Sequence, residues 1–144
     1  MIKIIAGGKA SKGWVLDGVS EYSKRLKKPF DVRFEFFEED KLARFLEKWP
    51  FSPSSEFVIL LDERGSGLSS IEFSEKLEQC FNSSREVVII IGGAYGVSSE
   101  VRERADFVWS FSRQVFPHEL MRVMLTEQIY RAQEIARGGK YHHE

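Results

Sequence analysis

The 144-residue sequence has little cysteine and no long apolar run. Its one cysteine, Cys80, permits no internal disulfide; within an apolar helical pattern it indicates a buried structural thiol in a reducing cytoplasm. No apolar stretch approaches the roughly 18 residues that span a bilayer. The first residues lack the apolar core and cleavage site of a signal peptide. Repeats, low-complexity stretches and long linkers are also absent, so we expect a single domain over residues 1–144.

Histidine is scarce as well, and its spacing does not suit a metal site. The sequence has His118, His142 and His143, and adjacent histidines point apart. Neither His-x-x-x-His nor Cys-x-x-Cys occurs, and Glu144 does not complete a ligand set. A Gly-x-Ser-x-Gly elbow is missing too, which disfavours a Ser/His/Asp hydrolase. We therefore expect no bound metal.

The net charge of -1 argues against strong non-specific binding of nucleic acid. The charge is unevenly spread, however. Residues 1–33 carry eight Lys/Arg against three Asp/Glu, whereas residues 34–63 carry three against eight. Four of the basic residues gather in segment 24–28. Two interpretations remain open there: cations suit the C-terminal end of a helix, and the same cluster suits RNA phosphates.

Strand and helix patterns alternate along the chain. Strand patterns cover residues 2–6, 30–37, 57–61, 87–91 and 107–109. Helical patterns cover residues 15–26, 42–49, 69–81 and 117–137, with a short helix after residue 98. We expect Pro29 to end the first helix, Asp62 to stop the third strand, and Ser69 with Glu72 to form a capping box. The alternation predicts an α/β fold with a mainly parallel sheet and helices on both faces.

Three loops follow strands at the edge where α/β proteins bind ligands: residues 62–67, 92–96 and 110–116. The glycine-rich segment 92–96 is neither a dinucleotide fingerprint nor a P-loop, so a simple turn and a ligand loop both remain open. The polar and aromatic segment 110–116 suits an aromatic ligand such as adenine. An ordinary loop before a helix that starts at Pro117 gives the same pattern.

The long helical pattern over residues 117–137 is apolar on more than one side. A surface helix needs only one apolar stripe. We therefore expect this helix to be covered by its own sheet and by a partner subunit, with burial inside one subunit as the alternative.

Three stretches together resemble the RlmH family of SPOUT methyltransferases: LLDERGSGLSS, IIIGGAYGVSSE and SFSRQVFPHELMRVMLTEQIYRAQEIARGGKYHH. The resemblance covers essentially the whole chain in order and length. It implies a homodimer with a C-terminal trefoil knot. It also implies S-adenosylmethionine-dependent methylation of N3 of a pseudouridine in large-subunit (23S) ribosomal RNA, on the assembled ribosome.

The resemblance also implies where the cofactor binds. The family's cofactor positions fall on Leu61, Gly92, Gly93, Phe111, Ser112, Arg113, Gln114, Val115 and Phe116. Tyr95 departs from the family pattern, which has a small or acidic residue at this place.

The C-terminal region supplies the candidates for chemistry. N3 of a uracil ring must lose a proton before or during methylation, so a base or an anion-stabilising contact is needed. We assign that contact to His142, with Arg122 and Arg131 as electrostatic support. Arg131 and Glu127 equally suit a plain helix ion pair. The tail after the long helix either completes the active site or is a frayed end, and His143 stands where the family has Lys or Arg.

Two other classes of protein fit parts of the pattern. One is a non-catalytic ribosome-binding module with the same fold. The other is a nucleotide-binding oxidoreductase, which is disfavoured because no acidic residue follows a G-x-G-x-x-G at the ribose position.

Overall fold

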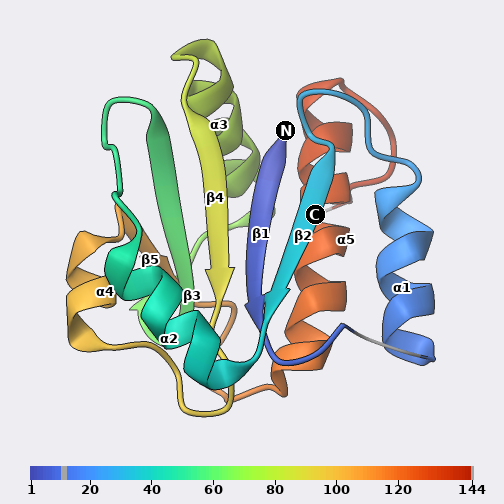
Figure 1. Ribbon diagram of the computed structural model, residues 1–144. Coiled ribbons are helices and arrows are strands. Elements are labelled where there is room, and N and C mark those ends of the chain that lie inside the picture. The colour runs from blue at the N-terminus through green and yellow to red at the C-terminus, as the bar shows by residue number, and fades with distance from the viewer. Residues whose placement is uncertain (11–12, 144) are drawn as a thin grey trace.

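The computed structural model describes residues 1–10 and 13–143, in which strands and helices alternate (Figure 1). The strands are β1 (Ile2–Gly7), β2 (Val32–Phe37), β3 (Glu56–Ser66), β4 (Glu86–Ile91) and β5 (Phe107–Trp109). The helices are α1 (Trp14–Ser23), α2 (Glu39–Lys48), α3 (Ser70–Asn82), α4 (Ser99–Arg104) and α5 (His118–Ala136).

The strands form one sheet in the order β2-β1-β4-β3-β5, and every neighbouring pair is parallel. Helices α3 and α5 cover one face of this sheet, with α1 packed beside α5, while α2 and α4 cover the other face (Figure 1). The predicted α/β class, with a parallel sheet and helices on both faces, is confirmed. The trefoil knot stays a prediction.

Side chains alternate between the two faces along each central strand. Ile4 of β1 and Ile89 of β4 point to the α3–α5 side, whereas Ile90 points to the α2–α4 side. Both faces of β4 are therefore buried, which explains its unbroken apolar run.

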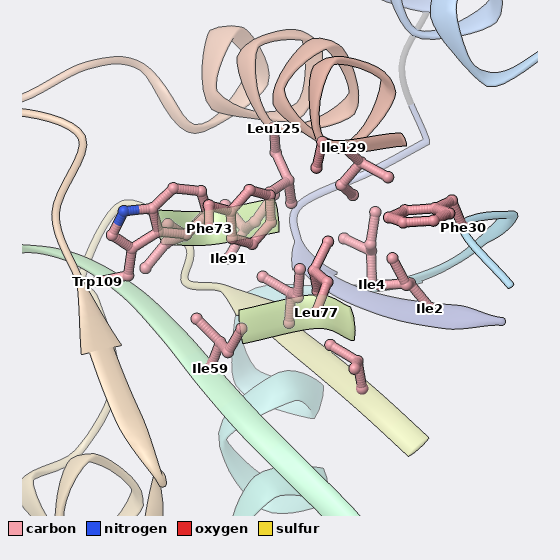
Figure 2. Packing of buried hydrophobic residues seen from close by; sticks show 14 of the residues in the cluster. Ile2, Ile4, Phe30, Ile59, Phe73, Leu77, Ile91, Trp109, Leu125 and Ile129 are labelled. Atoms are coloured by element: carbon pink, nitrogen blue, oxygen red, sulfur yellow. The ribbon is translucent and has the colours of Figure 1, made fainter. Parts of the chain in front are cut away.

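Helix α5 buries its apolar face inside the chain. Leu125 and Ile129 are fully buried and point from α5 towards Ile4 and Leu77 (Figure 2). On another side α1 approaches so closely that a Cβ on Gly18 would lie 3.0 Å from the side chain of Val123. Much of the apolar surface of α5 that the sequence assigned to a partner subunit is thus covered by α1 and α3. The intrasubunit alternative accounts for it.

Two predicted boundaries are wrong. Helix α1 ends at Ser23 and not at Pro29, so segment 24–28 follows the helix, with Lys24 as the C-cap and the backbone N–H groups of Arg25 and Leu26 bonded to carbonyls of its last turn. Strand β3 does not stop at Asp62 but continues to Ser66. Its extension pairs with β5, where the backbone N–H of Ser110 donates to the carbonyl of Ser66 over 2.9 Å. A contact this distant in sequence leaves no local pattern.

Serine caps begin α3 and α4 as predicted. The Ser69 hydroxyl accepts from the backbone N–H of Glu72, and the Glu72 carboxylate accepts from the backbone N–H of Ser69. Ser98 caps α4, the short helix expected after this residue. Each such cap contributes about 1 kcal/mol. Cys80 is buried as expected, and burial raises the pKa of its thiol.

Within the described ranges the chain has neither a membrane-spanning helix nor a cluster of metal ligands. No helix within residues 1–10 and 13–143 combines the length and apolarity needed to cross a bilayer. In the same residues no group of three or more His, Cys, Asp or Glu side chains is placed to hold a metal ion. Glu144, which the histidine hypothesis included, lies outside the described residues.

Candidate functional site

A pocket of about 650 Å³ lies at the edge of the sheet where β3 and β4 end, beside the first turn of α5. Strands β3 and β4 are parallel neighbours with Leu61 opposite Ile91, so the loops after them meet at the same place. In Figure 1 these loops gather at the lower end of the sheet, where the chain enters α5. The position is the one expected for a ligand site in an open α/β sheet.

Most of the residues that the sequence assigned to the cofactor line this pocket together. They are Leu61, Gly92, Gly93, Phe111, Ser112, Gln114, Val115 and Phe116. Arg113 is the exception, because its exposed side chain does not line the pocket. The sequence assignment missed Asp62, His118 and Met121, which also line it. In the sequence, these three residues are marked only by their position after an apolar strand pattern or near the start of the long helical pattern.

Segment 110–116 is held in shape by its own polar side chains. The buried Ser110 hydroxyl donates to the carbonyl of Ser112 over 2.7 Å, and the backbone N–H of Gln114 donates to the Ser112 hydroxyl over 3.1 Å. This leaves Val115 on the pocket wall with 77% of its surface exposed. An exposed apolar side chain in a preformed hollow suits contact with a ligand.

The glycine-rich segment 92–96 forms a tight turn on the opposite wall. The backbone N–H of Gly96 donates to the carbonyl of Gly93 over 3.0 Å, and Gly96 has a φ of 71°, which favours glycine. A Cβ on Gly92 would lie 3.3 Å from Cα of Gly96. The segment therefore presents backbone atoms, rather than side chains, to much of the pocket.

An ionised carboxylate lies at the end of the pocket that β3 forms. Burial opposes ionisation of Asp62, but hydrogen bonds from the side chain and backbone of Arg64, and from Arg102, outweigh it and lower its pKa. Asp62 is thus a fixed negative charge near neutral pH.

Arg122 is buried in the second turn of α5, at the pocket end of the helix. It donates from Nη2 to the carbonyl of Gly7 over 2.8 Å and from Nη1 to the carbonyl of Lys9 over 3.0 Å. Its guanidinium lies 4.8 Å from the ring centre of Phe36, and burial lowers its pKa. These contacts fasten α5 to the end of β1. Arg122 therefore ties α5 to the end of β1, and its assignment as electrostatic support for catalysis stays a prediction.

Arg131 and His142 lie together in a second cluster at the other end of α5. Arg131 makes a bidentate ion pair with Glu127, at 2.9 Å from Nε and 2.5 Å from Nη2 to Oε1. The Tyr141 hydroxyl donates to the same oxygen over 3.1 Å, and the guanidinium of Arg131 lies over the Tyr141 ring. Tyr141 and His142 fold back on α5, so the tail is not frayed at these two residues. The predicted ion pair between Arg131 and Glu127 is present.

Two pKa shifts follow from this cluster. The hydrogen bond to Glu127 raises the pKa of Arg131. Burial and the negative charge of Glu127 raise the pKa of Tyr141 to about 12. Tyr141 is therefore a neutral hydrogen-bond donor near pH 7 and does not act as a base.

The cluster also sets the tautomer of His142. Arg131 Nη1 lies 3.2 Å from His142 Nδ1, and a guanidinium can only donate. Nδ1 is therefore the acceptor, and the neutral imidazole carries its proton on Nε2. This Nε2 is inaccessible to solvent and has no hydrogen-bond partner among residues 1–10 and 13–143. A buried N–H donor without an acceptor is destabilising and uncommon in folded proteins.

Known proteins that are similar to this chain are methyltransferases of one family. The family described as "Predicted SPOUT methyltransferase" matches residues 1–142. "Ribosomal RNA large subunit methyltransferase H" of Caldicellulosiruptor bescii is 44% identical, with 99% of each chain covered. The protein of the same name from Desulfitobacterium hafniense is 42% identical, with 98% of each chain covered. The chain belongs to the RlmH family of SPOUT methyltransferases.

A solved structure shares the fold at lower identity. The SpoU methyltransferase AviRb from Streptomyces viridochromogenes, in complex with the cofactor AdoMet, aligns with a TM-score of 0.51 and 11% identity. The alignment covers 96% of this RlmH-family chain and 59% of the AviRb chain, so it supports the fold alone.

The two sites of this RlmH-family chain are far apart. Met121 lines the pocket and Arg131 lies in the tail cluster. At 1.5 Å per residue, the ten residues between them correspond to about 15 Å along α5. Figure 1 shows the same separation, with the tail at the upper end of α5 and the pocket loops at the lower end.

Proposed function

We propose that this chain is an S-adenosylmethionine-dependent methyltransferase that methylates N3 of a pseudouridine in large-subunit (23S) ribosomal RNA. We further infer that residues 1–144 act as a single domain on the assembled ribosome, in the cytoplasm. The observation that supports this most directly is the pocket at the strand ends, which gathers eight of the nine residues assigned to the cofactor. The near full-length similarity to ribosomal RNA large subunit methyltransferases H supports the substrate.

The pocket suits S-adenosylmethionine in size and chemistry. Its volume of about 650 Å³ falls in the range of small-molecule sites. Leu61, Phe111 and Phe116 supply apolar surface for an adenine ring, and the glycine turn supplies backbone N–H and C=O groups for polar edges. When bound, the cofactor supplies a methyl group on a positively charged sulfonium, which is open to in-line displacement.

His142 is proposed to stabilise the pseudouridine ring as N3 loses its proton to water. Negative charge then spreads over the two ring carbonyl oxygens that flank N3. The Nε2–H of His142 has the tautomer of a donor and lacks an acceptor among the described residues. Because Nε2 is inaccessible to solvent in the free chain, we propose that the tail shifts when RNA binds and lets Nε2–H donate to one of these oxygens. Arg131 fixes this tautomer and adds positive charge. Of the two roles assigned to His142, the geometry favours the anion-stabilising contact over the base.

The separation of the two sites supports a homodimer with shared active sites. The tail cluster lies about 15 Å from the pocket of its own chain, so we propose that it reaches the pocket of a second copy. The outward stripe of α5 continues towards the tail cluster: Leu120 and Met124 lie at i and i+4, followed by Glu127 and Arg131. Leu120 and Met124 are half-buried without a partner chain. This stripe is the proposed dimer contact.

A basic turn beside the tail is proposed to bind RNA phosphates. Gln133 of α5 accepts from the backbone N–H of Lys27 over 2.6 Å and donates to the carbonyl of Arg25 over 3.1 Å, which docks the turn on α5. Lys27 and Lys28 are exposed, and no described carboxylate lies within 4.0 Å of either amine. Lys24 and Arg25 lie at the end of α1 and pair with its Glu21, whereas Lys27 and Lys28 lie beyond the helix. We propose that Lys27 and Lys28 contact RNA phosphates.

Mass spectrometry of nucleosides from large-subunit RNA tests the proposal. We expect cells that lack the gene to lose one N3-methylpseudouridine, and the wild-type gene to restore it. A gene carrying a bulky pocket substitution, Ser112→Trp, should not restore it. Unchanged RNA in the deletion strain would refute the proposed activity. Calorimetry that shows no S-adenosylmethionine binding by the wild-type chain would instead favour a non-catalytic ribosome-binding protein.

A further inference from the structure

The cofactor pocket shares one wall with a second hollow. A pocket of about 500 Å³ lies between α2 and α4, and four residues of segment 92–97 line both hollows. These are Gly93, Tyr95, Gly96 and Val97. The wall is thin here, because it is flanked by empty space on both sides. Tyr95 does not anchor it, since 93% of its surface is exposed.

One carboxylate ties this wall to the rest of the molecule. Glu39 Oε1 accepts a hydrogen bond of 2.8 Å from the backbone N–H of Ala94, which lies 55 residues away in sequence. Glu39 is the first residue of α2 and is half-buried, whereas its neighbours Glu38 and Asp40 are exposed. The distance is that of a good hydrogen bond, and the bond lies at a solvent-exposed position.

Glu39 also explains why residue 93 is glycine. A Cβ on Gly93 would lie 2.9 Å from both Cγ and Oε1 of Glu39, closer than real Cβ contacts. Conformation gives no such reason, because Gly93 is not among the glycines with positive φ. On the side of β1, a Cβ on Gly7 would lie 2.7 Å from the backbone nitrogen of Gly93. Gly93 is therefore closely packed between the end of β1 and the Glu39 side chain.

We infer that Glu39 is a positioning residue for the cofactor: its carboxylate holds turn 92–96 in the shape that S-adenosylmethionine binds. The inference rests on the proposed function and assigns a residue outside the pocket's family positions. Without the hydrogen bond between Glu39 and Ala94, turn 92–96 can move towards the second hollow. The cofactor must then restore the turn when it binds, which weakens its affinity.

A purely structural role for Glu39 makes different predictions. An acidic residue in the first turn of α2 also stabilises the helix through its dipole, and Asp40 does so equally. Glu39→Asp keeps the charge but is one methylene too short to reach Ala94. Glu39→Gln loses the charge but keeps the acceptor and its reach. The two variants therefore distinguish the hydrogen bond to Ala94 from the stabilisation of α2 by negative charge.

Calorimetric titration with S-adenosylmethionine provides the test. We expect Glu39→Asp to raise the Kd about tenfold and Glu39→Gln to leave it within about threefold of wild type. Asp40→Asn is the matched control and should not change the Kd. In methylation assays Glu39→Asp should raise KM for the cofactor while kcat at saturation stays within a few-fold. A Kd for Glu39→Asp equal to that of wild type refutes the inference.

A double-mutant cycle tests the close contact itself. Gly93→Ala should weaken binding in the wild-type background and much less in the Glu39→Asp background, where the shorter side chain leaves room. Gly92→Ala should have the same effect in both backgrounds, because its Cβ meets Gly96 instead. Additive effects of Gly93→Ala and Glu39→Asp would contradict the inference. Failure of the wild-type chain to bind the cofactor would instead overturn the proposed function.

Discussion

Mixing two inactive variants tests whether active sites are shared between two copies of the chain. One variant lacks residues 141–144 and so keeps its pocket but loses His142. The other carries Ser112→Trp, which fills the pocket but leaves the tail intact. If the tail of one copy completes the pocket of the other, a heterodimer of the two variants contains one complete site. If each chain uses its own tail, the heterodimer contains none.

The contacts that the truncation removes indicate how far stability, cofactor affinity and methyl transfer should change. Truncation removes the Tyr141–Glu127 hydrogen bond and the Arg131–His142 contact, both half-buried. Each hydrogen bond is worth about 1 kcal/mol, so the truncated chain should stay folded. Cofactor affinity should stay within a few-fold, because the nearest tail contact, at Glu127, lies six residues or about 9 Å along α5 from Met121 of the pocket. Methyl transfer should fall at least about 100-fold, the usual effect of removing one donor that stabilises developing charge.

The assay follows methyl transfer to large-subunit RNA after the two variants are coexpressed or unfolded and refolded together. Random pairing of equal amounts makes half of the dimers heterodimers, each with one complete site of two, so activity should reach about a quarter of wild type. His142→Gln, which keeps an N–H donor near the place of Nε2, should retain more activity than His142→Ala. A mixture no more active than its parts would refute the shared site.

Three further predictions follow from single features of the structure. The double variant Lys27→Ala/Lys28→Ala should reduce the slope of log affinity for ribosomes against log salt concentration by about one to two. Its Kd for the cofactor should stay unchanged. As a control, neutralising the exposed Lys41 and Lys48 should change neither the slope nor the Kd. Met124→Glu should shift the chain from dimer to monomer in sedimentation at micromolar concentration; a wild-type monomer would contradict the proposed contact. The pKa of Asp62 is lower in the folded state than its ordinary 3.8, so this group stabilises the fold above that pH and the contribution is lost as pH falls below about 4. Asp62→Asn should therefore flatten the decline of Tm in acid, and an unchanged decline would show that the carboxylate is not stabilised.

The elements that the sequence predicts correctly are those whose causes are local. The apolar run of β4 reports burial on both faces, and the pair Ser69 and Glu72 forms a cap within one turn. The loops at the strand ends follow from parallel pairing, which brings carboxyl ends together. From these features the sequence predicts a ligand site at the carboxyl ends of the strands.

The features that the sequence misses depend on contacts between distant residues. Strand β3 extends because Ser66 pairs with Trp109, and α1 and α3 cover part of the apolar surface of α5. Arg122 illustrates the same point for the site. Its pattern suggests electrostatic support for catalysis, yet its donors bind the carbonyls of Gly7 and Lys9, more than 110 residues away. Helical periodicity places Arg122 on a face of α5 but does not reveal which segment that face meets.

The polar groups around the pocket and those around the tail have different partners. Around the pocket, polar groups from distant segments meet within one chain: Arg122 binds the end of β1, and Glu39 binds the turn after β4. Around the tail the opposite holds, since the buried Nε2 of His142 has no acceptor in the described part of the chain. We propose that the chain holds its cofactor site through such internal contacts and leaves the His142 donor for its substrate. In the proposed dimer, RNA binds between the pocket of one copy and the tail of the other and supplies the acceptor that His142 lacks in the described part of the chain.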